Sequence, residues 1–362
     1  MKTLLDYLHD LRSLIHFDDS PQLDNLVVLD PQWLIDVFKK VITVKPYDSR
    51  EKKFVDLWCK LETDGLLDEQ LLEHVWGTLC SNKETCESLL GIMERFTLLC
   101  LWPTATAGNK TYLVPSMLKT HPPTEIVDLI ASARIPSLFL TFGNSQVPPG
   151  FFPRLILRLF QWGKERFWKP VNPRDHLFNN FARFFSSEHE HCSVIFLCHS
   201  SVVEIVVHRA NSSLKMAEIP SLKFTASEEF QHDIAGINCA RAVRRQLAVM
   251  LECMRNEFCW LRNMRYEMSV ICPVCCCRGA VTYCPTHHER RCKQEQCLHF
   301  FPLSKLCTDK KSIICTKSAS AQDTRVQIIQ FTPWLCSSQQ KVNNRVLFYL
   351  TLPKIDVYTS RP

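Results

Sequence analysis

The stretch LDPQWL, residues 29–34, contains the signals that begin an α-helix. Asp30 can accept a hydrogen bond from a free amide of the first turn, and Pro31 stands where its missing N–H removes no hydrogen bond. The sequence therefore predicts a helix starting directly after Asp30, and we expect Trp33 to be buried in the core below it. Apolar residues follow at the helical period, at Leu34, Val37, Phe38 and Val41.

Around this stretch, residues 1–130 are rich in short helical patterns and poor in strand patterns. A helix, a turn at Gly65 and a second helix precede a third helical stretch at residues 86–101. Residues 112–115 then resemble a strand that follows a turn near Gly108. Three helices closed by a hairpin are typical of a winged helix, so the sequence predicts a helical, winged-helix-like first domain.

The pattern changes at residues 135–270, which predict a second domain of the α+β class. Strand-like residues 137–142 precede a helix that begins after Gly150, and residues 194–197 and 202–207 predict a β-hairpin. Residues 241–268 predict a long helix, whose apolar stripe either packs in the core or also serves a partner helix. The stripe comprises Val243, Leu247, Met250, Met254, Phe258, Leu261, Met264 and Met268.

Residues 271–362 form a Cys/His-rich tail, in which we expect short strands at residues 326–329 and 346–350. Ten of the 19 cysteines lie between Cys272 and Cys336, which favours a structural zinc site of the ribbon type. A Cys-x-x-Cys turn brings two thiolates to one ion, and a tetrahedral site needs four nitrogen or sulfur donors. The predicted ligands are Cys272, Cys275, Cys297 and His299, and the alternates, for this or a second site, are Cys284, His287, His288 and Cys292.

Two other interpretations of these cysteines stay open from the sequence. They can be reduced structural thiols, or they can include a redox or catalytic thiol, although no βαβ pattern accompanies the Cys-x-x-Cys. With one zinc ion expected per chain, the fold class is α+β with a small zinc-stabilised β tail.

Composition and charge exclude several classes of function. The 362 residues have 46% hydrophobic and 22% charged composition, which is typical of folded domains. The net charge of +6 comes without a run of Lys and Arg, so no nucleic-acid partner is expected. No apolar run approaches the roughly 20 residues of a membrane-spanning helix, and the N-terminus lacks a signal-peptide pattern. We therefore expect a cytoplasmic protein.

Motifs for nucleotide binding and catalysis are missing from the sequence. It contains no Gly-x-x-x-x-Gly-Lys-Ser/Thr, no Gly-x-Gly-x-x-Gly, no kinase signature and no Gly-x-Ser-x-Gly. The sequence thus predicts a chain without catalytic residues of its own, although a longer parent protein could carry GTPase or kinase activity.

Several motifs resemble the COR domain, the segment that follows the Roc GTPase domain in Roco proteins. They are LHD at 8–10, IHF at 15–17, LDPQWL at 29–34, GLL at 65–67, YLVPS at 112–116, PGFF at 149–152 and ARF at 182–184. The resemblance covers roughly residues 1–270, and the tail looks like a Cys/His extension found after COR in some animal Roco proteins.

This resemblance implies a helical COR-A half at residues 1–130 and an α+β COR-B half at residues 135–270. It also implies a scaffold that docks on a Roc-type GTPase domain in cis or in trans, relays its nucleotide state in signalling, and forms a homodimer.

Two alternatives to this function remain. One is a winged-helix nucleic-acid-binding protein, but the helix expected at residues 86–101 carries Glu87 and Glu94 against Arg95, which is unfavourable beside phosphates. The other is a fragment of a larger GTPase or kinase polypeptide whose catalytic domains are absent from this chain.

Overall fold

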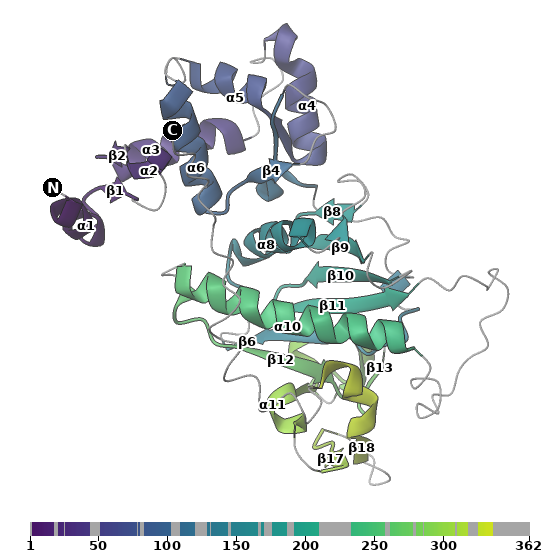
Figure 1. The fold of residues 1–362 in the computed structure, drawn as a ribbon. Helices are drawn as coiled ribbons and strands as arrows, with labels where there is room; N and C mark the ends of the chain where they lie inside the picture. Colours follow the sequence, from purple (N-terminus) through teal and green to yellow (C-terminus); the bar gives the residue numbers. More distant parts are fainter. Residues whose placement is uncertain are drawn as a thin grey trace.

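The computed structural model shows a mixed helix and sheet fold (Figure 1). A helical part with its own hydrophobic core precedes a large sheet, and the Cys/His-rich residues pack at the far edge of that sheet. The structure describes residues 2–17, 21–24, 26–43, 51–77, 79, 83–102, 109–119, 129–130, 132–143, 146–165, 168–169, 176–186, 192–209, 233–257, 261–277, 280–284, 286–307, 310–317 and 325–335.

The first part consists of short helices with two small sheets between them. Its helices are α1 (Lys2–Asp10), α2 (Pro21–Asp24), α3 (Pro31–Ile42), α4 (Val55–Asp64), α5 (Glu69–Trp76) and α6 (Lys83–Arg95), with 3-10 turns η2 (Lys52–Phe54) and η4 (Pro115–Met117). Its strands are β1 (Ile15–His16), β2 (Val27–Val28), β3 (Leu66–Asp68), β4 (Cys100–Trp102) and β5 (Thr111–Leu113).

Helix α3 begins as the sequence predicts. Asp30 has an extended backbone, and its Oδ1 accepts a hydrogen bond of 2.9 Å from the backbone N–H of Gln32. Pro31 occupies the first turn. The predicted apolar stripe is buried, at Leu34, Val37, Phe38 and Val41.

The prediction that Trp33 is buried is wrong, because 39% of this residue is exposed whereas Leu34 is 2% exposed. At about 100° per residue, Trp33 lies roughly 90° around the helix from the middle of the buried stripe. Its neighbour in sequence therefore faces the core while the indole stands at the edge of the stripe.

A short sheet closes the helical part, with strand order β3-β5-β4. Gly65 ends α4 in the left-handed conformation, with its N–H bonded to the carbonyl of Leu61, and a Cβ there would lie 2.8 Å from Leu118. The helix predicted over residues 86–101 is too long, because α6 ends at Arg95 and residues 100–102 form β4. The description of this part as a winged helix stays a prediction.

An antiparallel sheet of eight strands follows. Its order is β16-β12-β6-β11-β10-β9-β7, with β8 beside β9. The predicted hairpin is present, since β10 and β11 pair from Cys192 opposite Arg209 to Cys198 opposite Val203. The strands are β6 (Leu138–Phe142), β7 (Trp168–Lys169), β8 (Leu177–Phe178), β9 (Phe181–Ser186), β10 (Cys192–Cys198), β11 (Val202–Arg209), β12 (Tyr266–Ile271) and β16 (Phe300–Pro302).

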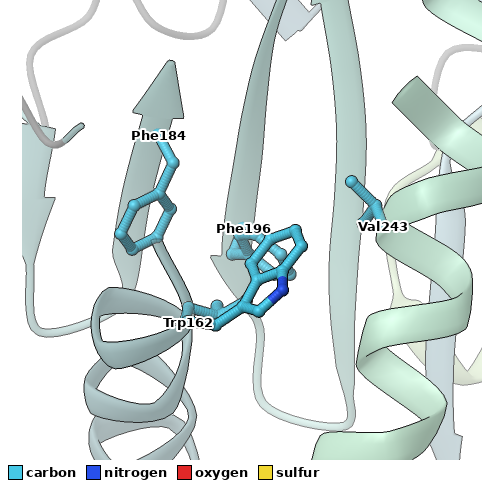
Figure 2. A pocket seen from close by; sticks show the side chains of 5 residues that line it. Trp162, Phe184, Phe196 and Val243 are labelled. Carbon is cyan, nitrogen blue, oxygen red and sulfur yellow. The ribbon is translucent and has the colours of Figure 1, made fainter. Parts of the chain in front are cut away.

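Two long helices, α8 (Phe151–Glu165) and α10 (Ile234–Glu257), cover the same face of this sheet (Figures 1 and 2). Trp162 from α8 and Val243 from α10 meet over Phe184 and Phe196 of the strands (Figure 2). The gap between these apolar side chains has no room for a water molecule. This place in the fold is therefore core and no ligand pocket.

The long helix predicted over residues 241–268 differs from the structure at both ends. Helix α10 runs from Ile234 to Glu257, and Met268 lies in strand β12 opposite Leu140. Spacings of three and four placed Met264 and Met268 on the helical stripe, but pairing with β6 satisfies the backbone of this segment instead. Within α10 the stripe is buried against the chain's own sheet, at Val243, Leu247, Met250 and Met254.

The Cys/His-rich residues are continuous with the core of the sheet. Strand β16 pairs with β12, and the indole N–H of Trp334 donates to the carbonyl of Pro136 at 2.6 Å. The strand predicted at residues 326–329 ends at Gln327, where β18 ends and the 3-10 turn η8 begins. The strand predicted at residues 346–350 lies outside the described residues. The elements are β13 (Cys276–Cys277), β14 (Ala280–Cys284), β15 (Glu289–Cys292), η7 (Glu295–Cys297), α11 (Leu303–Leu306), β17 (Ser312–Ile314), β18 (Arg325–Gln327) and η8 (Ile328–Trp334).

The division into domains at residues 1–130, 135–270 and 271–362 stays a prediction. No helix among the described residues is both long enough and apolar enough to cross a bilayer.

Candidate metal centre

Four Cys and His side chains meet at the end of strand β12, and we call them the outer cluster. They are Cys272, Cys275, His299 and Cys315, whose ligand atoms all lie within 4.8 Å of one another. His299 Nδ1 lies 3.3 Å from the sulfur of Cys275 and 3.5 Å from that of Cys315. The three cysteines are buried, so the cluster belongs to the interior.

The sheet itself positions the outer cluster. Cys272 directly follows β12 and His299 directly precedes β16, and the N–H of Cys272 donates to the carbonyl of His299 at 2.8 Å. A tight turn then returns the chain, with the N–H of Cys276 bonded to the carbonyl of Cys272, and brings Cys275 to the same point. Cys315 follows β17, so three separate chain segments converge on this cluster.

A second group, the inner cluster, lies at the β14–β15 hairpin. It consists of Cys284, His287, Cys292 and Cys297, again with all ligand atoms within 4.8 Å of one another. His287 Nδ1 lies 3.5 Å from the sulfur of Cys284, 3.4 Å from that of Cys292 and 3.5 Å from that of Cys297.

Hydrogen bonding does not explain three sulfurs around one ring nitrogen. An imidazole nitrogen carries either one proton or one lone pair, so it takes part in one good hydrogen bond at a time. Zinc binds sulfur at about 2.3 Å and nitrogen at about 2.0–2.1 Å in tetrahedral geometry, which places bound sulfur and nitrogen roughly 3.5 Å apart. The separations in both clusters fit four donors arranged around one common ion.

Burial and hydrogen bonding shift the thiol pKa values in opposite directions. Burial raises the pKa of Cys272 and of Cys275 above the usual range. A backbone N–H bond from His287 lowers the pKa of Cys284 to about 6, whereas burial, together with Cys284 and Cys292, raises that of Cys297 to about 11. Thiolates this close together repel one another, so full ionisation of either cluster requires a cation.

His299 favours the neutral form that binds metals. Burial, and then the charge of Lys317, lowers the pKa of His299, which leaves the ring neutral near pH 7. Each cluster therefore offers three thiols and one imidazole, a donor set typical of structural zinc.

The predicted ligands are divided between the two clusters. Cys272, Cys275 and His299 come together as expected, but Cys297 lies in the inner cluster. We expected Cys297 and His299 to alternate onto one side of a strand, whereas Cys297 ends the 3-10 turn η7. The alternates Cys284, His287 and Cys292 form the rest of the inner cluster, and His288 belongs to neither group of the described residues.

Cys315 completes the outer cluster and was missed by the sequence reasoning. It lies 16 residues after His299, and no short motif joins the two. The only signal for it is the concentration of cysteines in this part of the chain.

Comparison with known proteins supports the resemblance over the N-terminal third of the chain. Residues 1–118 match the family described as C-terminal of Roc, COR-A domain. The chain therefore carries a COR-A domain at its N-terminus, as the motifs predict.

Its relatives include three proteins of Dictyostelium discoideum. The chain is 36% identical to probable serine/threonine-protein kinase qkgA over 172 residues, 30% to probable serine/threonine-protein kinase roco11 over 165 residues, and 28% to probable serine/threonine-protein kinase pats1 over 172 residues. The matches cover 44%, 42% and 45% of this chain but 10%, 10% and 5% of the relatives. The chain thus spans about a tenth or less of their length.

Proposed function

We propose that this chain is a non-catalytic docking and dimerisation module that binds a Roc-type GTPase domain and relays its nucleotide state in cytoplasmic signalling. The observation that carries the proposal is the COR-A match over residues 1–118. The sequence adds that no phosphate-binding or kinase motif is present, so catalysis would belong to a partner or to other domains of a parent protein.

The helical part offers an exposed apolar surface suited to such docking. Leu4, Tyr7 and Leu11 follow one another at spacings of three and four residues along and just after α1, and they are 59%, 60% and 55% exposed. These spacings place the side chains on one helical face. A stripe of this kind is typical of a helix that docks on a partner.

Trp33, half-exposed at the start of α3, is a second candidate contact. Tryptophan is enriched among the residues that contribute most to binding at protein interfaces. We propose that the α1 stripe and Trp33 contact the Roc-type domain, and that residues 135–270 contribute to self-association.

Relay of nucleotide state requires unequal affinities. A chain that binds the GDP and GTP forms equally can shift neither state, whereas a tenfold difference corresponds to about 1.4 kcal/mol. The test is titration of the purified chain against a Roc-type domain from the same organism, loaded with each nucleotide in turn, with light scattering for the dimer.

The matched variants are Leu4→Ala with Tyr7→Ala in the proposed surface, and Ile314→Ala as an equally exposed control in β17. We expect the double variant to weaken binding by at least tenfold and the control to bind as the unchanged chain does. A folded, monomeric chain that binds neither the GDP form nor the GTP form of the Roc-type domain would contradict the proposal.

A structural zinc ion in the outer cluster is the second part of the proposal. Cys272, Cys275, His299 and Cys315 would hold it, in place of the predicted set with Cys297. The converging segments and the donor distances support this site. Cys315→Ser, compared with Cys59→Ser as an exposed control, should reduce the zinc content of the purified protein by one equivalent.

Nucleic-acid binding is not favoured as a second function. Helix α6, the candidate recognition helix, carries Glu84, Glu87 and Glu94 beside Lys83 and Arg95. Its charges are mixed, whereas phosphate contact requires an excess of positive charge.

A further inference from the structure

We propose that the inner cluster is a separate zinc site, so that the chain binds two zinc ions, and that the inner ion holds Glu295 against the β10–β11 turn. This inference goes beyond the docking function, because it concerns a different part of the chain and a different ligand. It rests on the donor set of the inner cluster and on the contacts of Glu295.

The two clusters are complete without sharing a ligand. Each has three sulfurs and one ring nitrogen, the four donors that a closed structural zinc site needs. Cys297 and His299 are only two residues apart, yet they belong to different clusters. The intervening Leu298 is buried, which separates the two sets of donors.

The order of ligands along the chain is nested. The outer cluster takes the first two ligands, Cys272 and Cys275, and the last two, His299 and Cys315, while all four inner ligands lie between them. The inner loop runs only over residues 284–297. Removing an inner ligand therefore leaves all four donors of the outer site in the chain, so the two sites can be tested separately.

The backbone of the inner loop is held in an unusual form. Both His288, in the turn between β14 and β15, and Arg291, within β15, have positive φ, at 50° and 58°. Residues other than glycine adopt this conformation at an energetic disadvantage, and it persists when the surroundings impose it. Convergence of Cys284, His287 and Cys292 on one ion would impose it here.

The inner loop also makes a close contact with the large sheet. Glu295 lies between the ligands Cys292 and Cys297, in the 3-10 turn η7. Its Oε1 accepts hydrogen bonds from the N–H of Ser200 at 3.2 Å and from the Ser200 hydroxyl at 3.1 Å. Its Oε2 accepts from the N–H of Ser201 at 2.6 Å and also from the Ser201 hydroxyl.

One carboxylate thus takes up four donors from the turn that joins β10 and β11. Two backbone amides of this turn have their partner in a loop nearly 100 residues away, 95 from Ser200 and 94 from Ser201. A 3-10 turn of three residues provides little rigidity of its own. The ligands that flank Glu295 would supply it, so the inner ion is expected to keep the carboxylate on the turn.

The first experiment measures metal content in the full chain, purified without added metal. We expect two zinc equivalents in the unchanged chain and one in a Cys284→Ser, Cys292→Ser double variant. Cys307→Ser is the matched control, since Cys307 lies between His299 and Cys315 in the sequence and belongs to neither cluster of the described residues. It should keep two equivalents.

If the double variant still contained two zinc equivalents, the proposal of an inner zinc site would be overturned. One equivalent in the unchanged chain, lost only in Cys315→Ser, would overturn the inner site and leave the outer one standing. No zinc in the unchanged chain would overturn both sites, and the docking proposal is tested by a different measurement.

A substitution that preserves the fold tests the ligand itself. His287→Cys replaces the nitrogen donor by sulfur and should keep two equivalents, whereas His287→Ala should lose one. After cobalt replacement, His287→Cys should change the visible spectrum of one of two ions from a three-sulfur to a four-sulfur type. A spectrum identical to that of the unchanged chain would contradict ligation by His287.

The second experiment follows hydrogen exchange at the amides of Ser200 and Ser201. Both should be protected in the unchanged chain and in Cys307→Ser, and both should exchange at least tenfold faster in the double variant. Glu295→Ala should expose the same amides while retaining two zinc equivalents. Full protection of these amides after loss of the inner ion would overturn the link between the ion and the turn.

Discussion

The helical part and the Cys/His part are both built from short elements, but different interactions hold them together. In the helical part, large apolar side chains such as Trp58, Leu61 and Leu71 are fully buried in one core. Between Cys272 and Cys315, the buried side chains include six cysteines, and strand β15 exposes three of its four residues. We therefore expect apolar burial to dominate in the first part, whereas the second part would depend on the proposed zinc ions that join its segments.

Metal removal should separate the two parts most strongly. Structural zinc contributes roughly 10–16 kcal/mol in small zinc-binding peptides, which is comparable to the whole stability of a domain. After chelation we expect amide protection to disappear in β14, β15 and β17 and to persist in α3, α4 and α6. Hydrogen exchange with mass spectrometry measures the amide protection. Equal protection of both parts in metal-free protein would contradict the idea that only the Cys/His part depends on metal.

Within the helical part, the next largest effect is expected from Trp76→Ala. Trp76 is 2% exposed, and its indole N–H donates to the carbonyl of Val37 at 3.2 Å, which joins α5 to α3. Its loss should lower the free energy of unfolding by about 3–5 kcal/mol.

Trp33→Ala is the matched control for that prediction, since the same residue type is half-exposed on the neighbouring helix. We expect a change within about 1 kcal/mol. Urea unfolding followed by circular dichroism compares the two variants, and equal losses would show that Trp33 is packed after all.

A smaller effect is expected at the start of α3. Asp30→Ala removes the bond to the N–H of Gln32 and should lower the free energy of unfolding by about 1 kcal/mol. Asp36→Ala, which removes an exposed carboxylate from the middle of the same helix, should change it by only a few tenths. If Asp30→Ala and Asp36→Ala unfold at the same urea concentration, the hydrogen bond from the N–H of Gln32 to Asp30 does not stabilise the helix.

The smallest effect concerns the sheet between the two parts. Burial, and then the charge of Arg183, lowers the pKa of His208 in β11 below its ordinary value. Between this lowered pKa and the ordinary value of about 6.5, His208 is protonated in the unfolded chain but neutral in the folded chain. The free energy of unfolding is therefore greatest above about pH 6.5 and falls as the pH drops toward the lowered pKa.

His208→Gln should therefore flatten the fall of melting temperature between about pH 7.5 and about pH 5.5. Acid also releases zinc, because its ligands take up protons. The measurement follows zinc release in parallel, and an identical slope in the two proteins would contradict the role of His208.

Local patterns predicted several elements correctly. The cap at Asp30 and the hairpin of β10 and β11 depend on neighbours in sequence, and both are present. Predictions were wrong where the secondary structure depends on residues distant in sequence. Met268 fits a helical spacing, but its segment pairs with β6 and β16 as a strand. Trp33 fits the start of a helix, but only the packing of α3 decided which side faces the core.

The candidate metal centre shows the same division. The Cys-x-x-Cys turn placed Cys272 and Cys275 together, because four residues of chain suffice to bring two thiols to one point. Cys297 and His299 were assigned together by their spacing, although Cys297 ends the turn η7 and joins the inner cluster while His299 joins the outer cluster. Cys315 could not be assigned at all, since only the path of β17 brings it back to His299.

Residues close along the chain were enough to reveal the COR-A resemblance, the start of α3, the absence of phosphate-binding motifs and the concentration of cysteines. The tertiary structure was needed to show which apolar side chains stay exposed, where β16 joins the sheet, and how eight Cys and His side chains divide into two sets of four. These depend on contacts between residues far apart in sequence, which are formed only when the sheet assembles and brings its edges together.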